Sequence, residues 1–116
     1  MINELIERIF ANFTVDQTAI PVKFLHYDGH DDAYIVYHQQ DANNSFSGDN
    51  NLLGYVAYYD FDVYSKGNYE AIVAAMMKIL TDNDFVWEPS RSSMDLYDPD
   101  INYYYRTFNF AYAKEV

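Results

Sequence analysis

Possible metal ligands cluster in the segment 26–32, which reads His-Tyr-Asp-Gly-His-Asp-Asp. Imidazole nitrogens and carboxylate oxygens are the ligand types that divalent transition-metal ions take in proteins. However, His26 belongs to a predicted strand, His30 follows a glycine turn, and their spacing matches no recurrent ligand pattern. We therefore expect no metal site and no other cofactor, and a small metal-dependent enzyme stays only as a third alternative.

A second ligand-like stretch, 41–46, has oxygen-bearing side chains at three positions of a calcium loop. The pattern then fails, because Phe46 stands where the tight turn needs glycine and no glutamate occupies the twelfth position. The chain has only four glycines and contains no nucleophile elbow, phosphate-binding loop or zinc-protease motif. We expect no catalytic residues and predict that the protein is not an enzyme.

Composition narrows the remaining classes of function. The 116 residues fit one domain, 1–116, and 18 acidic against 7 basic residues give a net charge of −11. Such a charge repels phosphates and anionic lipids, so we expect neither sequence-specific nucleic-acid binding nor a membrane partner. No stretch is long and apolar enough for a membrane span, and the absence of cysteine excludes disulfides.

The periodicity of apolar residues predicts elements in the order α-β-β-β-α-β-β. They are a helix at 2–10, strands at 20–27, 33–38 and 53–65, a helix at 69–80, and strands at 85–88 and 101–114, with a possible short return at 94–98. Asn68 stands where it would cap the second helix.

This order favours an α+β domain with a mostly antiparallel β-sheet of four to five strands and two helices packed on one face. The two longest alternating segments, Leu53–Ser65 and Ile101–Lys114, are predicted to be central antiparallel neighbours. The apolar side chains that they turn toward the second helix are Phe61, Val63, Phe108 and Phe110.

A polar hairpin arm, Gln39–Asn51, is predicted between the second and third strands. Loops of this length are uncommon in compact domains and tend to be functional or mobile, although an inert loop is the plain alternative. We expect the arm to be mobile in the monomer and to become ordered against a partner. Its candidate contact residues are Asp41, Asn43, Asn44, Phe46, Ser47, Asp49 and Asn50.

The sheet face opposite the helices is the second candidate interaction surface. The chain contains 13 tyrosines, whose apolar rings and polar tips suit protein interfaces as well as partly wet sheet faces. Alternation predicts that four of them lie exposed among charges on this face: Tyr58, Tyr64, Tyr103 and Tyr105. An ordinary solvated sheet face is the alternative interpretation.

Several short motifs carry a family resemblance. They are Ile-Pro-Val at 20–22, Tyr-Ile-Val-Tyr at 34–37, Phe-Ser-Gly-Asp-Asn at 46–50, Asp-Val-Tyr-Ser-Lys at 62–66 before a helix, and Phe-Val-Trp at 85–87. In this order the chain resembles the tail-terminator or tail-completion (head–tail joining) proteins of long-tailed bacteriophages and prophages.

The resemblance implies a virion structural protein that forms a ring, usually a hexamer. Such a ring caps the tail tube and joins it to the head connector, so the implied partners are further copies, the major tail tube protein and the connector proteins. The implied location is the tail–head junction of the virion, and the host bacterial cytoplasm during assembly. The alternative from another class is a free-standing acidic protein that binds or inhibits a host enzyme as a nucleic-acid mimic.

The acidic residues gather in three segments, Asp28–Asp32, Asp41–Asp49 and Asp95–Asp100. In a ring through which DNA passes, an acidic wall would repel the phosphates and keep friction low. Solubility explains the same excess of negative charge, and both interpretations stay open.

Overall fold

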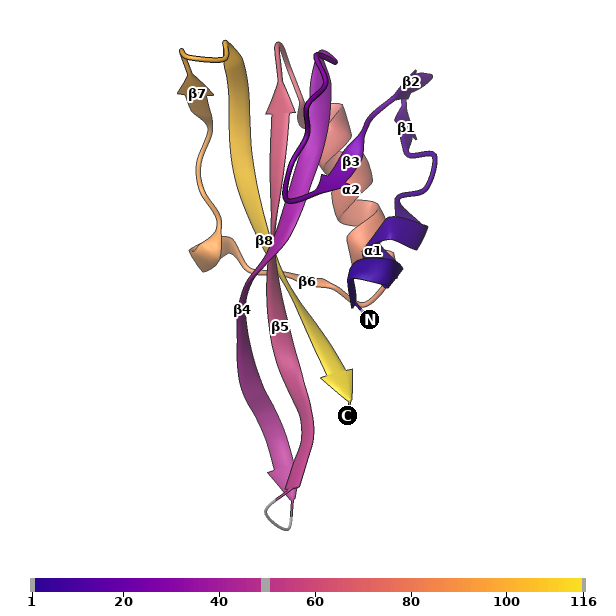
Figure 1. Cartoon of the computed structure of the whole chain (residues 1–116), viewed down its shortest axis with the longest axis vertical. Helices are drawn as coiled ribbons and strands as arrows, with labels where there is room; N and C mark the ends of the chain where they lie inside the picture. Colours follow the sequence, from indigo (N-terminus) through magenta and orange to yellow (C-terminus); the bar gives the residue numbers. More distant parts are fainter. Residues whose placement is uncertain (1, 49–50, 116) are drawn as a thin grey trace.

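A computed structural model describes the backbone of residues 2–48 and 51–115 and the side chains of residues 2–42 and 54–114. The elements are α1 (Ile2–Ile9), β1 (Thr14–Val15), β2 (Thr18–Ala19), β3 (Val22–Phe24), β4 (Ala33–Gly48), β5 (Asn51–Ser65), α2 (Glu70–Asp82), β6 (Val86–Trp87), the 3₁₀-helix η1 (Pro89–Arg91), β7 (Leu96–Asp98) and β8 (Tyr103–Glu115). Figure 1 shows them along the long axis of the molecule.

The main sheet has six strands in the order β3-β4-β5-β8-β6, with β7 also paired to β8, while β1 and β2 form a separate ribbon. All its pairs are antiparallel except β3–β4, which is parallel. The fold is therefore α+β with a mostly antiparallel sheet, as predicted, although the sheet has more strands than the four to five expected.

The first predicted strand, 20–27, is much shorter in the structure. Pro21 has no N–H to donate, and Leu25 adopts a left-handed backbone conformation with φ of 64°, which ends the strand after Phe24. The chain then turns back through residues 25–32, so that β3 runs parallel to β4 instead of forming a hairpin with it.

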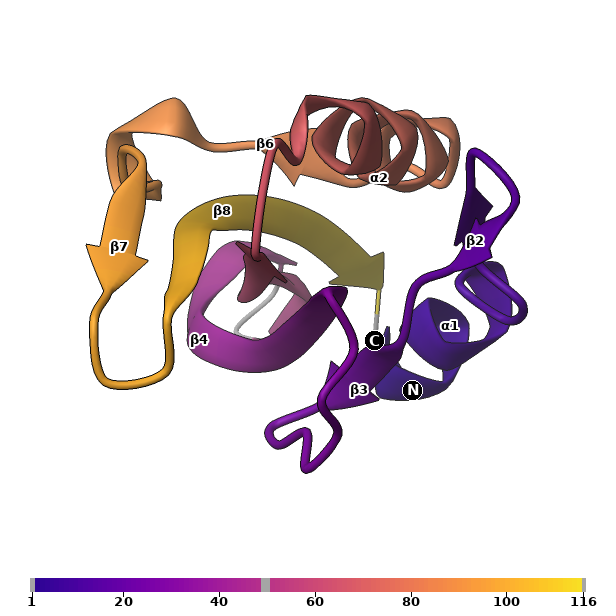
Figure 2. The same cartoon turned by 90° about the horizontal axis from the view of Figure 1, so that it is seen from above.

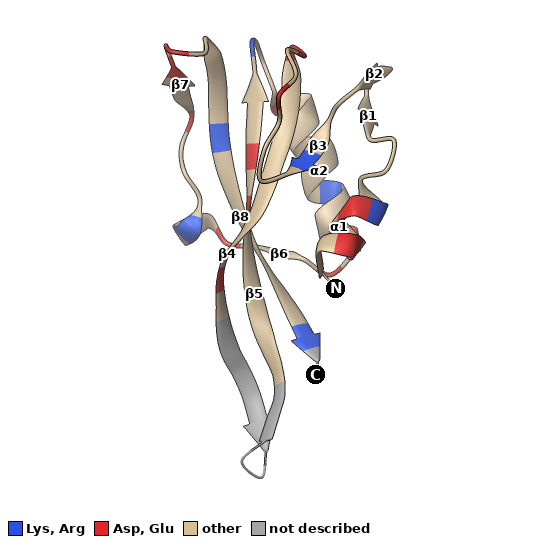
Figure 3. Ribbon diagram, viewed as in Figure 1, with Lys and Arg blue, Asp and Glu red and all other residues tan. Residues whose placement is uncertain are grey.

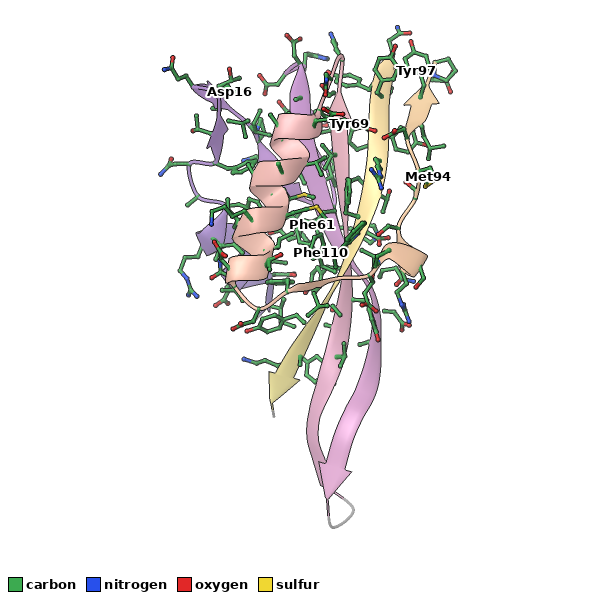
Figure 4. All side chains as sticks on the ribbon, turned by 180° about the vertical axis from the view of Figure 1, so that it is seen from behind. Asp16, Phe61, Tyr69, Met94, Tyr97 and Phe110 are labelled. Carbon is green, nitrogen blue, oxygen red and sulfur yellow. The ribbon has the colours of Figure 1, made fainter. Side chains whose placement is uncertain are left out.

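The pairing of β5 with β8 at the centre of the sheet is confirmed, with Phe61 opposite Phe108 and Tyr59 opposite Phe110. These rings lie beneath α2, where Figure 4 labels Phe61 and Phe110. Phe61, Val63, Phe108 and Phe110 are each at most 1% exposed, so the predicted core positions are confirmed.

Both helices contribute to the same core. Ile6 of α1 and the residues Met76 and Leu80 of α2 are fully buried in one cluster with Phe61. Figure 2 shows α2 beside β8 and α1 beside β3. The N-cap residue of α2 is Tyr69, which makes no side-chain cap hydrogen bond, so Asn68 is not the N-cap that was predicted. Asn68 lies one residue earlier, where its side chain accepts a hydrogen bond from the backbone N–H of Glu70 over 2.8 Å. Among the helices that the structure describes, none is long and apolar enough to cross a membrane.

The predicted arm is a continuation of regular structure and not a loop. The backbone of residues 39–48 belongs to β4, which pairs with β5 as far as Gly48 opposite Asn51. The polar residues of this segment show no apolar alternation, so the sequence did not predict a strand here. A two-stranded ribbon that is hydrogen-bonded along its length does not need an apolar face. The resulting hairpin extends away from the helices and gives the molecule a longest dimension of 52 Å (Figure 1).

Candidate interaction face

The face of the sheet opposite the helices is built by three neighbouring strands, and we call it the tyrosine face. Residues paired across strands share a face, so the register determines its members. They are Tyr34, Val36, His38 and Asp41 of β4, Tyr58, Asp60, Asp62 and Tyr64 of β5, and Tyr103, Tyr105, Thr107, Asn109 and Ala111 of β8.

Aromatic rings gather at the end of this face where β5 finishes and β8 begins. The Tyr64 ring stacks between those of Tyr34 and Tyr105, at centroid distances of 4.8 and 5.5 Å. Tyr103 meets Tyr34 edge-on at 5.4 Å, and Tyr27 from the loop before β4 lies 4.4 Å from Tyr34. Aromatic pairs prefer such offset and edge-on geometries. The contacts between these rings therefore connect β4, β5, β8 and the loop before β4.

The prediction that Tyr58, Tyr64, Tyr103 and Tyr105 are all exposed is wrong. Tyr103 is buried, at 7% exposure, and the other three are half-buried. The reason is cover from distant segments: the hydroxyl of Tyr103 donates to the backbone carbonyl of Asp31 over 2.7 Å, and the Arg91 guanidinium lies 3.7 Å above the ring of Tyr58. On the same face of β5, Asp60 and Asp62 lie between Tyr58 and Tyr64.

A polar row crosses the middle of the tyrosine face. The Asn109 amide donates to Asp60 over 2.8 Å, and the Thr107 hydroxyl donates to Asp62 over 2.6 Å. His38 Nε2 lies 3.6 Å from the second oxygen of Asp60. Asn109 is fully buried, so this row is part of the folded structure and not a loose surface network.

Burial shifts the proton affinity of groups on this face. It raises the pKa of Tyr64 to about 12, with smaller contributions from the negative charge of Asp62 and from neighbouring tyrosines. Burial also raises the pKa of Asp62, against the opposing effect of the Thr107 hydrogen bond. Both shifts favour the uncharged form of a group in a partly dry environment.

The raised pKa of Tyr64 predicts a loss of stability in alkali. The native chain holds the Tyr64 proton more tightly than the unfolded chain, whose tyrosine has a pKa of 10.0. This contribution is therefore fully present below pH 10 and lost as the pH rises toward about 12. After allowance for solvent screening we expect a loss of ~1–2 kcal/mol in urea unfolding from this residue.

The matched control for this prediction is Tyr64→Phe, which keeps the ring and removes the titrating hydroxyl. Its free energy of unfolding should fall less steeply than that of the parent chain between pH 10 and 12. Parallel curves for the two proteins would show that Tyr64 titrates normally in the folded state.

The histidine–aspartate segment 26–32 does not converge on a metal position. His26 Nε2 lies 2.5 Å from Asp28 Oδ1, whereas the Asp31 carboxylate accepts a hydrogen bond from the Tyr27 hydroxyl. Among the side chains that the structure describes, those of residues 2–42 and 54–114, no group of three or more His, Cys, Asp or Glu is placed to hold a metal ion.

The predicted arm residues divide into three groups. The Asp41 side chain is described and lies 3.7 Å from Arg91. Asn43, Asn44, Phe46 and Ser47 are placed along the backbone of β4. Asp49 and Asn50 lie outside the described residues.

Two acidic segments that are distant in the sequence meet at one end of the molecule. The bond from the Tyr103 hydroxyl to Asp31 connects the 28–32 loop to the start of β8, and Asp98 is paired with Tyr103 in the sheet. Figure 3 shows acidic residues at this end, and Figure 1 shows that β4 and β5 extend from it toward the opposite end of the molecule. We call it the acidic end.

Sequence reasoning missed Tyr34 and His38 as members of the tyrosine face, and Arg91 as a residue that covers part of it. The sequence could have predicted the positions of Tyr34 and His38, because Tyr34, Val36 and His38 are alternate residues of a predicted strand and so lie on one face of it. No sequence pattern could have predicted the position of Arg91, since only the path of η1 brings it over Tyr58.

Comparison with known proteins adds no family to this description. No known family model matches the chain, and no curated protein matches it either.

Proposed function

We propose that the protein is a structural subunit of a bacteriophage tail, a tail terminator that assembles into a ring, with a hexamer as the expected form. This ring would cap the tail tube and join it to the head connector. The observation that carries the proposal is the long β4–β5 hairpin, which leaves the body of the domain and offers an unpaired strand edge.

The free edge belongs to β4. On its outer side β3 pairs only with Ile35, Val36 and Tyr37, and no other described strand continues that pairing along residues 38–48. A long open edge exposes backbone N–H and C=O groups that another chain can use, and monomeric proteins usually protect such edges. An edge of this length therefore supports a role in assembly.

The two ends of the molecule also suit a directional contact between copies. The described strands β4 and β5 extend to one end of the long axis (Figure 1), and the acidic end lies at the other (Figure 3). When one surface of a subunit binds a different surface of the next, the repeated contact closes into a ring if the rotation allows it. The acidic end would be compatible with a DNA channel, because it repels phosphates.

Mass in solution tests the proposal. Light scattering on the full chain, separated by size and measured at several concentrations, should give a particle of about six times the 13.6 kDa chain mass. A chain that stays monomeric at all concentrations, alone and with tail tube protein, would contradict the proposal. That result would favour the second candidate, an acidic inhibitor of a host enzyme, which the charge at the acidic end also fits.

A further inference from the structure

We propose that the Asp28–Gly29 pair is a site of spontaneous isomerisation, at which Asp28 converts to isoaspartate. The pair lies in the loop between β3 and β4, and it is the only Asp-Gly or Asn-Gly pair in the chain. The reaction needs no partner protein, so it does not depend on the tail-terminator proposal.

The reaction begins when the Gly29 backbone nitrogen attacks the side-chain carboxyl carbon of Asp28. A bond forms between these two atoms, and one carboxylate oxygen leaves as water with one proton from the Gly29 nitrogen and one from an acid. Water then adds to the former backbone carbonyl of Asp28 and breaks its bond to the Gly29 nitrogen. This second step releases one proton, so the net reaction is an isomerisation in which no atom is gained or lost.

Packing of the tyrosine cluster requires glycine at position 29. A Cβ atom there would overlap the hydroxyl oxygen of Tyr27, whose ring centroid lies 4.4 Å from that of Tyr34. The lack of a Cβ also leaves the Gly29 nitrogen unhindered toward the carboxyl group before it. Among the described residues no backbone carbonyl accepts the Gly29 N–H, and the Asp28 side chain is 89% exposed to water. The fold therefore retains a pair that is open to this reaction.

His26 is placed to supply the proton that the leaving oxygen needs. Its Nε2 atom lies 2.5 Å from Asp28 Oδ1. A positioned acid at this distance lowers the barrier to proton transfer, and the proton released in the second step restores the protonated ring. Across residues 2–42 and 54–114, no lysine or arginine forms an ion pair with Asp28. The proton donor that the structure shows at this carboxylate is therefore His26.

Isomerisation changes the path of the loop and keeps its charge. The backbone then runs through the side-chain carboxyl carbon of residue 28 and is one carbon atom longer. Asp31, three residues later, accepts hydrogen bonds from the Tyr27 hydroxyl and, through its backbone carbonyl, from the Tyr103 hydroxyl. A longer backbone displaces these acceptors, so we expect the isomerised chain to unfold at a lower urea concentration than the parent chain.

Labelling by an isoaspartate methyltransferase tests the site. After long incubation of the full chain at neutral pH, the enzyme should transfer a methyl group from S-adenosylmethionine to the new carboxyl group, and peptide mapping should place the label at residue 28. Asp28→Glu keeps the charge at this exposed position, but its longer side chain would have to close a six-membered ring. This variant should give only background labelling.

Two further variants test the role of His26. His26→Gln removes the proton donor and should slow labelling at least about tenfold, since general acid catalysis commonly contributes more than this. His30→Gln is the matched control, because it removes the same kind of side chain from another exposed position of the loop. It should change the rate of labelling less than about twofold.

Three results would overturn the proposal. Absence of label from the parent chain, label at other residues, or equal labelling of the parent chain and Asp28→Glu would remove the site. Equal rates for the parent chain and His26→Gln would exclude His26 from the reaction. Isomerised and parent chains that unfold at the same urea concentration would exclude the effect on the cover of Tyr103. All three results concern single chains, so none depends on whether a ring forms.

Discussion

Phe110→Ala is expected to lower the free energy of unfolding by ~3–5 kcal/mol in urea melts. Phe110 is fully buried and meets the ring of Phe61 edge-on at 5.8 Å. Its removal takes apolar contact from both strands of the central pair and leaves a cavity under α2, which the packed neighbours cannot fill. This is a large part of the total stability of a domain of this size.

Met94→Ala is the control for that measurement. Met94 is also a large apolar residue, but 77% of it is exposed, so the loss should stay within about 0.5 kcal/mol. A loss below about 1 kcal/mol for Phe110→Ala would contradict the position of this ring in the core.

Shortening the hairpin should abolish assembly while leaving the domain folded. Asn44 and Tyr55 are paired across β4 and β5, so residues 45–54 can be replaced by Asn-Gly, which closes a two-residue turn between paired strands. The variant keeps the pairing of β4 with β5 from Ala33 to Asn44, and we expect its melting temperature to change little. Light scattering should find a monomer at concentrations where the parent chain forms a ring.

The opposite end of the sheet offers a matched control. Asp98 and Tyr103 are paired in β7 and β8, and the turn 99–102 between them can likewise be replaced by Asn-Gly. This variant should assemble like the parent chain if the hairpin makes the contact. If both variants lose the ring, general damage to the sheet explains the loss, and if the first variant unfolds, the hairpin is part of the cooperative core.

Sequence by itself determined the central part of the fold. Phe61, Val63, Phe108 and Phe110 lie at alternate positions of two long segments, and burial of such rings is the largest favourable term in folding. Their phase decided which face of β5 and β8 packs under α2, since a slip of one residue would turn every ring outward. The helix after Asn68 followed from its apolar periodicity.

Only the tertiary structure decided what lies on the other face. Whether Tyr103 is open or covered depends on where the Asp31 carbonyl lies, 72 residues away in the chain. The same is true of the extension of β4 to Gly48, because its polar residues form a strand only where β5 runs alongside to accept and donate hydrogen bonds. Contacts between distant segments leave no local periodicity, so the covered tyrosines and the free strand edge could be found only in the folded chain.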